Sequence, residues 1–215
     1  MSLDGPRLAP LSGSAPTALV VLIHGYGSNG DDLISLARAI QPALPDAAFV
    51  APNAPSQLGR MAAAYQWWPI ETFSMAERAN GAASAAPALD AFITEQLETT
   101  GLPSGRLVLV GFSQGTMMAL HVGLRRSAPV AGIIGISGML VAPDSLAADI
   151  RARPPVLLIH GTEDDVVPFR SMHLATSALA AVGVDVETHV SPGTGHSVGP
   201  DGLAAATAFA IRVLP

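Results

Sequence analysis

The pattern G-x-S-x-G, which can carry a nucleophilic serine on a sharp turn between a strand and a helix, occurs twice in the chain. The first copy, GFSQG at 111–115, follows the apolar run RLVLV and precedes QGTMMALHVGLRR, a segment typical of a helix. This order would lift the Ser113 hydroxyl out at the carboxyl end of a sheet, where it could attack a carbonyl carbon.

The second copy, GHSVG at 195–199, lies in a loop. No histidine follows His196, so Ser197 would lack a base in the chain order nucleophile, acid, histidine. We predict Ser113 as the nucleophile.

A serine needs a base, and six histidines compete for that role. His24 and His160 each end a predicted strand and are expected to shape or brace the loop that follows. His196 alone lies after the last predicted strand, in the glycine-rich loop SPGTGHSVGP. Such a loop can bring an imidazole over the edge of a sheet, so we predict His196 as the base.

An acid should orient the imidazole by accepting its N–H and so fixing its tautomer. Three carboxylates, Glu163, Asp164 and Asp165, follow the predicted strand VLLIH in the loop GTEDDVVP. A run of acids could also be a solvated loop or a helix cap. The pattern by itself leaves the choice between Asp164 and Asp165 open.

The stretch LIHGYGSNGDDL contains G-x-G-x-x-G directly after a strand, which is also the pattern of a dinucleotide-binding loop. A dinucleotide site needs an acid at the end of the next strand, but that strand runs into Pro52 and Asn53, and Asp46 precedes it. We therefore interpret HGYG as a loop whose backbone N–H groups stabilise the negative charge that develops on a carbonyl oxygen during acyl transfer. Glycines let that backbone approach the oxygen closely.

The elements that must position these residues alternate along the chain. Near-continuous apolar strands separated by amphipathic helices predict a mostly parallel central sheet with helices on both faces, in one domain over residues 1–215. The N-terminal RLAPLSG is expected to add an antiparallel edge strand. The predicted strands are Ala18–Ile23, Ala47–Ala51, Arg106–Val110, Val130–Ile136, Val156–His160 and Val184–Val190, and the predicted helices are Asp31–Ile40, Ala85–Thr99, Gln114–Arg126, Phe169–Val182 and Asp201–Val213.

One segment breaks the alternation. Residues 52–86 include PNAPSQLGRMAAAYQWWPIETFSM, rich in chain breakers and large apolar side chains. Long irregular excursions in such domains are usually functional, so we place this one near the active site. An apolar wall for the substrate is predicted there, with one of the two tryptophans in the core and the other facing the site. Its members are Met61, Trp67 and Trp68, with Val166 and Val167 from the acidic loop.

Composition excludes several classes of function. The net charge of −6 argues against a nucleic-acid partner. The chain has Arg but no Lys, which rules out a P-loop lysine and any Schiff-base mechanism. It also has no Cys, which rules out a thiol nucleophile and a thiolate metal site. The N-terminus does not have the pattern of a signal peptide, and the longest apolar stretch is too short to span a bilayer. We expect a cytoplasmic protein without stable membrane insertion.

Together, LIHGYG, GFSQG, HGTEDDVVP and GTGHS resemble the phospholipase/carboxylesterase family of serine hydrolases, which includes bacterial carboxylesterases and acyl-protein thioesterases. The resemblance implies an α/β-hydrolase fold without a large separate lid domain. It also implies that the acid is Asp164, at the fifth position of H-G-x-x-D-x-x-V-P, and that the oxyanion is held by the backbone N–H groups of Tyr26 and Gln114. Trp67 occupies the place of the family's tryptophan. The chain departs from the family's H-G-x-G-D, because SNG separates Gly27 from Asp31.

The function expected from these observations is cleavage of a small-molecule carboxylic ester through an acyl-enzyme, with no cofactor and no metal. Two alternatives stay open: a thioesterase or lysophospholipase acting on acylated proteins or lipids, and a ligand-binding protein that has lost the chemistry. A complete set of nucleophile, acid and base in the right order argues against the second alternative. The oligomeric state is not determined by the sequence, which leaves a homodimer open.

Overall fold

Seven strands form one central sheet, in the order β1-β3-β2-β6-β7-β8-β9, in the computed structural model, which describes residues 3–59 and 63–214. All neighbouring strands run parallel except β1, which pairs antiparallel with β3. Both the mostly parallel sheet and the antiparallel N-terminal edge strand were expected from the sequence. The strands are β1 Arg7–Leu8, β2 Ala18–Ile23, β3 Ala47–Val50, β6 Leu107–Phe112, β7 Gly132–Ile136, β8 Val156–Gly161 and β9 Val186–Ser191.

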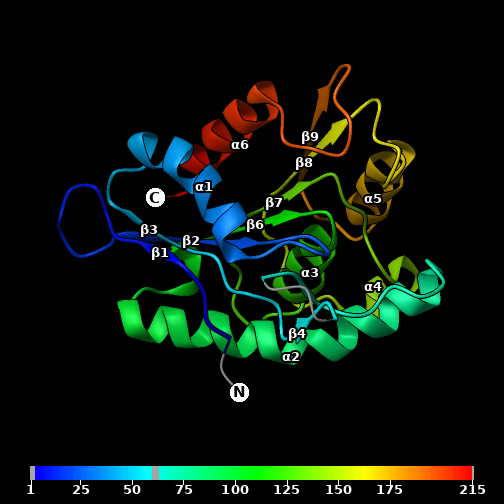
Figure 1. Cartoon of the computed structure of the whole chain (residues 1–215), viewed down its shortest axis with the longest axis horizontal. Coiled ribbons are helices and arrows are strands. Elements are labelled where there is room, and N and C mark those ends of the chain that lie inside the picture. Colours follow the sequence, from blue (N-terminus) through cyan, green and yellow to red (C-terminus); the bar gives the residue numbers. More distant parts are fainter. Residues whose placement is uncertain (1–2, 60–62, 215) are drawn as a thin grey trace.

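Helices cover both faces of the sheet (Figure 1). Side chains of α1 and α6 form one apolar cluster with one face of the strands, and those of α2, α3 and α5 form a second cluster with the other face. Alternation along β2 divides its side chains between the two clusters: Val20 and Leu22 join the first, and Val21 and Ile23 the second. The helices are α1 Gly30–Ile40, α2 Met75–Thr100, α3 Gln114–Gly123, α4 Leu146–Asp149, α5 Arg170–Ala181 and α6 Pro200–Val213, with short 3₁₀ turns at Gln41–Ala43, Ser104–Arg106 and Pro143–Ser145.

The predicted strands and the helices α1, α5 and α6 agree with the structure to within about two residues at each end, the usual uncertainty of such boundaries. Helix α3 ends at Gly123, before the predicted Arg126. No helix in the described part of the chain is both long and apolar enough to cross a membrane.

Helix α2 begins at Met75, ten residues before the predicted Ala85, and this prediction was wrong. The Ser74 hydroxyl caps the helix by accepting the Glu77 N–H at 3.1 Å. This S-x-x-E sequence is the N-terminal capping signature, and the helix that it starts contains both Gly81 and Pro87. The irregular excursion is therefore shorter than the predicted 52–86 and ends at residue 74.

The excursion is fastened to the rest of the fold. Strands β4 (Ser56–Gln57) and β5 (Tyr65–Gln66) pair antiparallel in a small hairpin. The backbone of Tyr65 accepts the Gly27 N–H at 2.8 Å and donates to the Ser28 oxygen at 2.9 Å. These bonds hold the excursion against the loop that follows β2, at the carboxyl edge of the sheet.

Candidate active site

The site lies where the order of strands reverses. The chain passes from β2 to β3 on one side and then crosses to β6 on the other, so the loops after β2 and β6 diverge. Open α/β sheets bind ligands at such a point, outside the carboxyl ends of their strands. The loops that follow β2, β6, β8 and β9 carry the residues predicted for the chemistry, namely Tyr26, Ser113, Asp164 and His196.

Ser113 occupies a strained turn between β6 and α3. Its φ of 55° and ψ of −116° are uncommon for a residue with a side chain. The flanking glycines are required by close contacts: a Cβ on Gly111 would lie 2.4 Å from the Gly115 oxygen, and a Cβ on Gly115 would lie 1.9 Å from the Ile23 oxygen. Tight packing of α3 against β2 and β6 therefore forces the turn that projects the Ser113 hydroxyl, as the G-x-S-x-G pattern indicates.

Three side chains from distant parts of the chain form a hydrogen-bonded line. His196 Nε2 lies 3.0 Å from Ser113 Oγ, and His196 Nδ1 lies 2.9 Å from Asp164 Oδ2. The Phe112 ring packs against the imidazole, with the ring centroids 5.0 Å apart. Ser197 lies exposed in the loop. The structure thus brings together the predicted Ser113, Asp164 and His196.

The acidic loop is folded so that only one of its carboxylates turns inward. Asp164 is 7% exposed, whereas Glu163 and Asp165 are exposed. Asp164 Oδ1 accepts the N–H groups of Val166 and Val167 at 3.0 and 2.8 Å. Burial by itself would raise the pKa of Asp164, but the hydrogen bonds from His196 and from these two N–H groups outweigh it and hold the pKa below its usual value. The carboxylate is therefore kept ionised.

A second histidine braces the same loop. His160 Nε2 donates to the Val167 oxygen at 2.8 Å and lies 3.3 Å from Asp164 Oδ2. Its role as a brace was expected from its position at the end of a strand, but its proximity to Asp164 was not. Asp164 is thus placed by an imidazole on each side and by the backbone of its own loop.

His24 holds the loop after β2 as a neutral imidazole. Its Nδ1 donates to the Gly25 oxygen at 2.7 Å, and its Nε2 accepts the Ala54 N–H at 2.9 Å, which defines one tautomer. Burial lowers its pKa, so the ring stays uncharged at neutral pH. His24 therefore connects this loop to the start of the excursion, consistent with a loop-shaping role.

The backbone N–H groups of Tyr26 and Gln114 are available to a ligand. Neither donates to another group in the described part of the chain, and Gln114 is the first residue of α3, where helical N–H groups lack partners. Both residues line one cavity with Ser113 and His196. The loop after β2 lies close to Ser113, because a Cβ on Gly25 would lie 3.1 Å from Ser113 Cβ. Two N–H groups are thus placed where an oxyanion could form.

The cavity beside Ser113 has a volume of about 340 Å³ and mostly apolar walls. Trp68, Val166 and Val167, all predicted as substrate-binding residues, line it. Trp67 does not; its indole is buried and donates to the His24 oxygen at 3.0 Å, so its predicted place in the wall was wrong. One tryptophan in the core and one at the site is the division expected for neighbours on an extended segment. Met61 lies outside the described residues.

Other residues that line the cavity were missed in the sequence. Met117 lies one helical turn after Ser113, and the spacing i, i+4 could have found it. Ile70, Phe73 and Arg78 lie within the predicted 52–86 segment, which was expected near the active site, but these three side chains were not singled out.

The side chain of Gln114 has a structural role that the sequence did not reveal. Its Oε1 accepts the Trp67 N–H at 2.9 Å, and its Nε2 donates to the Trp68 oxygen at 3.0 Å. All of these groups are buried. The residue after Ser113 therefore fixes the segment that forms the cavity wall.

No group of three or more histidine and carboxylate side chains is placed to hold a metal ion among residues 3–59 and 63–214. The buried charges at the site are instead compensated by hydrogen bonds within the protein, as described for Asp164. The arrangement as a whole offers a hydroxyl, a base, an anionic partner for the base and two free N–H donors. These are the groups needed for acyl transfer.

Residues 11–213 match the family model described as Phospholipase/Carboxylesterase. The chain is 29% identical over 236 residues to acyl-protein thioesterase 1 of Gibberella zeae, and the match covers 99% of both proteins. It is 30% identical over 231 residues to the protein of the same name from Mycosarcoma maydis, and this match covers 96% of the chain and 95% of that protein. Among solved structures it is similar to esterase PE8, with a TM-score of 0.95 and 47% identity over the full length of both chains.

Proposed function

The chain belongs to the phospholipase/carboxylesterase family, and we propose that it is a carboxylesterase that uses Ser113 as its nucleophile. The observation that carries this proposal is the hydrogen-bonded line from Ser113 Oγ through His196 to a buried, ionised Asp164. A serine hydroxyl is a weak nucleophile unless a base takes its proton as it attacks, and this geometry supplies that base.

In the proposed reaction His196 Nε2 removes the proton from Ser113 Oγ as the oxygen attacks the ester carbonyl carbon. The carbonyl oxygen becomes an oxyanion, which accepts the N–H groups of Tyr26 and Gln114. The tetrahedral intermediate collapses, the bond to the alcohol oxygen breaks, and the imidazolium gives its proton to the departing alcohol. Water then repeats the sequence on the acyl-enzyme, which releases the carboxylic acid and restores the hydroxyl.

Asp164 has two tasks in this scheme. Its carboxylate accepts the Nδ1–H of His196, which leaves Nε2 free to act as the base. It also balances the positive charge on the imidazolium while the proton is in transit. A carboxylate whose pKa is held below its usual value is ionised at neutral pH and so keeps its charge while the proton moves.

Relatives named acyl-protein thioesterase favour a second candidate, hydrolysis of thioesters. The groups around Ser113 would serve either reaction, because both proceed through an acyl-enzyme. Oxygen esters and thioesters with the same acyl chain distinguish them. A ratio of kcat/KM well above one for the oxygen ester supports the carboxylesterase, and a strong preference for the thioester replaces it with the second candidate.

The proposed nucleophile is tested by labelling the protein with a fluorophosphonate and locating the modified peptide. We expect the label on Ser113, and we expect Ser113→Ala to lower kcat for a p-nitrophenyl ester by about 10³-fold or more, because the three side chains act as a unit. Ser197→Ala is the matched control. Labelling of Ser197, or no labelling at all, would contradict the proposal; absence of both labelling and turnover would favour a ligand-binding protein.

A further inference from the structure

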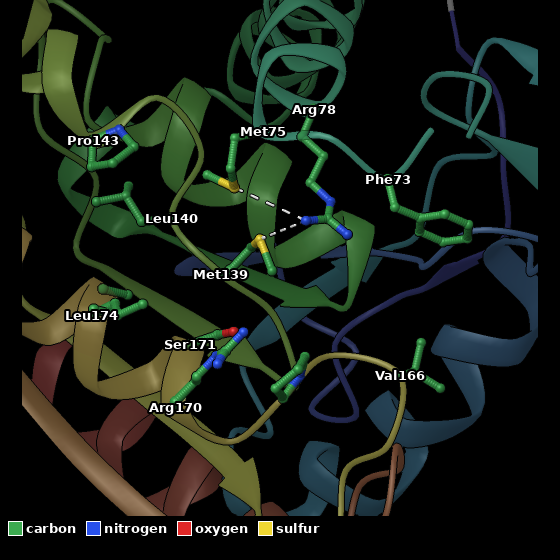
Figure 2. A pocket seen from close by; sticks show the side chains of 12 residues that line it. Phe73, Met75, Arg78, Met139, Leu140, Pro143, Val166, Arg170, Ser171 and Leu174 are labelled. Atoms are coloured by element: carbon green, nitrogen blue, oxygen red, sulfur yellow. Dashed lines mark hydrogen bonds between the residues drawn. The ribbon is translucent and has the colours of Figure 1, made fainter. Parts of the chain in front are cut away.

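A groove continues from the cavity beside Ser113. It has a volume of about 570 Å³ and shares Phe73, Arg78 and Val166 with that cavity. Figure 2 shows its walls, formed by the start of α2, by the segment that follows β7 and by the start of α5. A substrate bound at Ser113 could therefore extend past these three side chains into the groove.

The groove has an exposed apolar lining. Phe73 is 64% exposed, Met75 46% and Leu174 67%, which is unusual for large apolar side chains that gather in one place. Met139 and Leu140 complete the lining on the side of the β7 segment. Such a surface favours the hydrocarbon part of a ligand.

The charges in the groove have one sign. Among its described lining residues the charged side chains are Arg78 and Arg170, and no carboxylate lines either the groove or the cavity beside Ser113. The chain as a whole carries a net charge of −6. The lining charges of the groove are thus positive although the protein as a whole is negative, which favours an anionic ligand.

Arg78 stands at the junction of the two spaces and lacks an anionic partner. Its Nη1 contacts two thioether sulfurs, Met139 Sδ at 3.6 Å and Met75 Sδ at 4.0 Å (Figure 2). A thioether is a weak acceptor. No carboxylate of the described chain lies within ion-pair distance of Arg78. Other arginines do pair with a carboxylate, namely Arg125, Arg126 and Arg212.

We propose that Arg78 binds a carboxylate on the ester substrate, so that the preferred substrates are half-esters of dicarboxylic acids. This inference rests on the proposed esterase function and adds to it the class of substrate. A guanidinium offers a planar fork of donors that matches a carboxylate. A single cation in half-buried, apolar surroundings balances a monoanion. Arg170 lies apart from Arg78 in Figure 2, beside Ser171, so the two do not form a common site for a doubly charged group.

The experiment compares monomethyl esters of linear dicarboxylic acids of increasing length with their dimethyl esters, in which the distant carboxylate is masked. Initial rates are followed by titration of the released acid for wild type, Arg78→Met and Arg78→Lys. Arg38→Met, on the exposed surface of α1, is the control for the change in net charge.

At the chain length that spans Ser113 and Arg78, wild type should favour the half-ester over the diester by about 10-fold or more in kcat/KM. Arg78→Met should remove this preference, mainly by raising KM for the half-ester, and Arg78→Lys should keep part of it. The free dicarboxylic acid of the same length should inhibit hydrolysis of neutral p-nitrophenyl acetate competitively in wild type, and about 10-fold more weakly in Arg78→Met.

Turnover of neutral esters by wild type without a preference for any half-ester would overturn the inference while leaving the proposed function intact. Failure to hydrolyse any ester would instead contradict the proposed function. An equal loss toward half-ester and diester in Arg78→Met would mean that Arg78 only shapes the groove. A larger loss of preference in Arg170→Met than in Arg78→Met would place the anion elsewhere and would also overturn the assignment.

Discussion

Asp164 is set apart from its neighbours by the number of donors that it faces. Its carboxylate receives hydrogen bonds from His196 and from the backbone of Val166 and Val167, and it lies beside His160. Asp165 is exposed and takes part in none of these contacts. The adjacent residues of the acidic loop are therefore a matched pair for testing the role of the acid.

Asp164→Asn should reduce kcat by up to about 10⁴-fold, because an amide at this position favours the wrong imidazole tautomer. Asp165→Asn should change kcat by less than about twofold, since an exposed charge so close in sequence but outside the network contributes little. Steady-state kinetics with a p-nitrophenyl ester measure both. Small, equal losses in the two variants would mean that the orienting acid lies elsewhere.

His121, on α3, makes stability depend on pH. Burial lowers its pKa to about 4, Arg125 acts in the same direction, and Asp149 opposes them. As the pH falls from about 6.5 toward 4, the unfolded chain takes up a proton that the folded protein does not bind, so the free energy of unfolding decreases.

Between pH 7 and pH 4.5 the free energy of unfolding of wild type should therefore fall by about 1–2 kcal/mol more than that of His121→Leu. This figure allows for partial solvent access to the ring. His121 Nδ1 has no hydrogen-bond partner in the described part of the chain, so leucine should be tolerated at pH 7. Urea unfolding of both proteins at the two pH values measures the difference. Parallel losses of stability would show that His121 does not titrate in this way.

At the scale of elements, the contact between α2 and the excursion shapes the cavity. A Cβ on Gly81 would lie 2.2 Å from Cγ of the Trp68 indole. The glycine thus lets α2 approach the ring that forms the cavity wall. Gly81 lies within the helix because α2 begins at Met75 rather than at the predicted Ala85.

Gly81→Ala should destabilise the protein by about 1–3 kcal/mol, although alanine is normally favoured over glycine within a helix, because the rigid indole has to move. The displaced Trp68 should also lower kcat/KM. Gly105→Ala is a suitable control, since a Cβ there would meet no atom within 4 Å. Chemical denaturation and ester kinetics provide the measurements. A stability equal to or above that of wild type would show that the helix adapts at little cost.

The two adjacent tryptophans should behave differently. Trp68→Ala should change the dependence of kcat/KM on acyl-chain length for p-nitrophenyl esters, because each methylene in contact with the wall contributes at most ~0.8 kcal/mol, or a few-fold in rate. Trp67→Ala should instead lower stability by about 3–5 kcal/mol, with little change in the shape of that profile. A single profile for all three proteins, with folding verified by circular dichroism, would show that neither ring contacts the acyl chain.

At the scale of the whole molecule, the site is assembled from loops at one edge of the sheet, and hydrogen bonds join these loops to one another. The acidic loop and the histidine loop are joined by the Glu163 N–H to the Thr194 oxygen at 3.0 Å and by the Gly193 N–H to Thr162 Oγ1 at 2.9 Å. A Cβ on Gly161 would lie 2.1 Å from the Thr194 oxygen, so glycine is needed where the two loops meet. The pairing of β8 with β9 brings the two loops together and thus sets the position of His196.

Prolonged dialysis against EDTA should leave both kcat and the unfolding temperature unchanged, because the proposed chemistry uses only protein groups. Activity before and after dialysis, with calcium, magnesium and zinc added back separately, is the measurement. A loss that one of these ions restores would show that a metal takes part in the reaction or in folding.

The order of the elements and the residue types of the site could be predicted from local features of the sequence. Ser113 could be predicted as the nucleophile because the strand, the turn and the helix around it are consecutive in the chain, and the glycine requirement is local. His196 could be predicted as the base because it follows the last strand. The alternation of apolar strands and amphipathic helices likewise depends only on near neighbours, so it predicted the parallel sheet.

Which loop side chains turn inward depends on the folded chain and could not be predicted from spacing. Spacing left Asp164 and Asp165 open, and the fold selects Asp164 because its carboxylate meets donors from its own loop and from a residue 32 positions away. The backbone of Trp67 and Trp68 is held by hydrogen bonds to the Gln114 side chain, 47 and 46 positions along the chain. Arg78 lies at the junction of the cavity and the groove because α2, capped by Ser74, begins earlier than predicted from its composition. These outcomes depend on contacts between segments distant in sequence, which local periodicity does not encode, because they form only when the sheet brings the ends of its strands together.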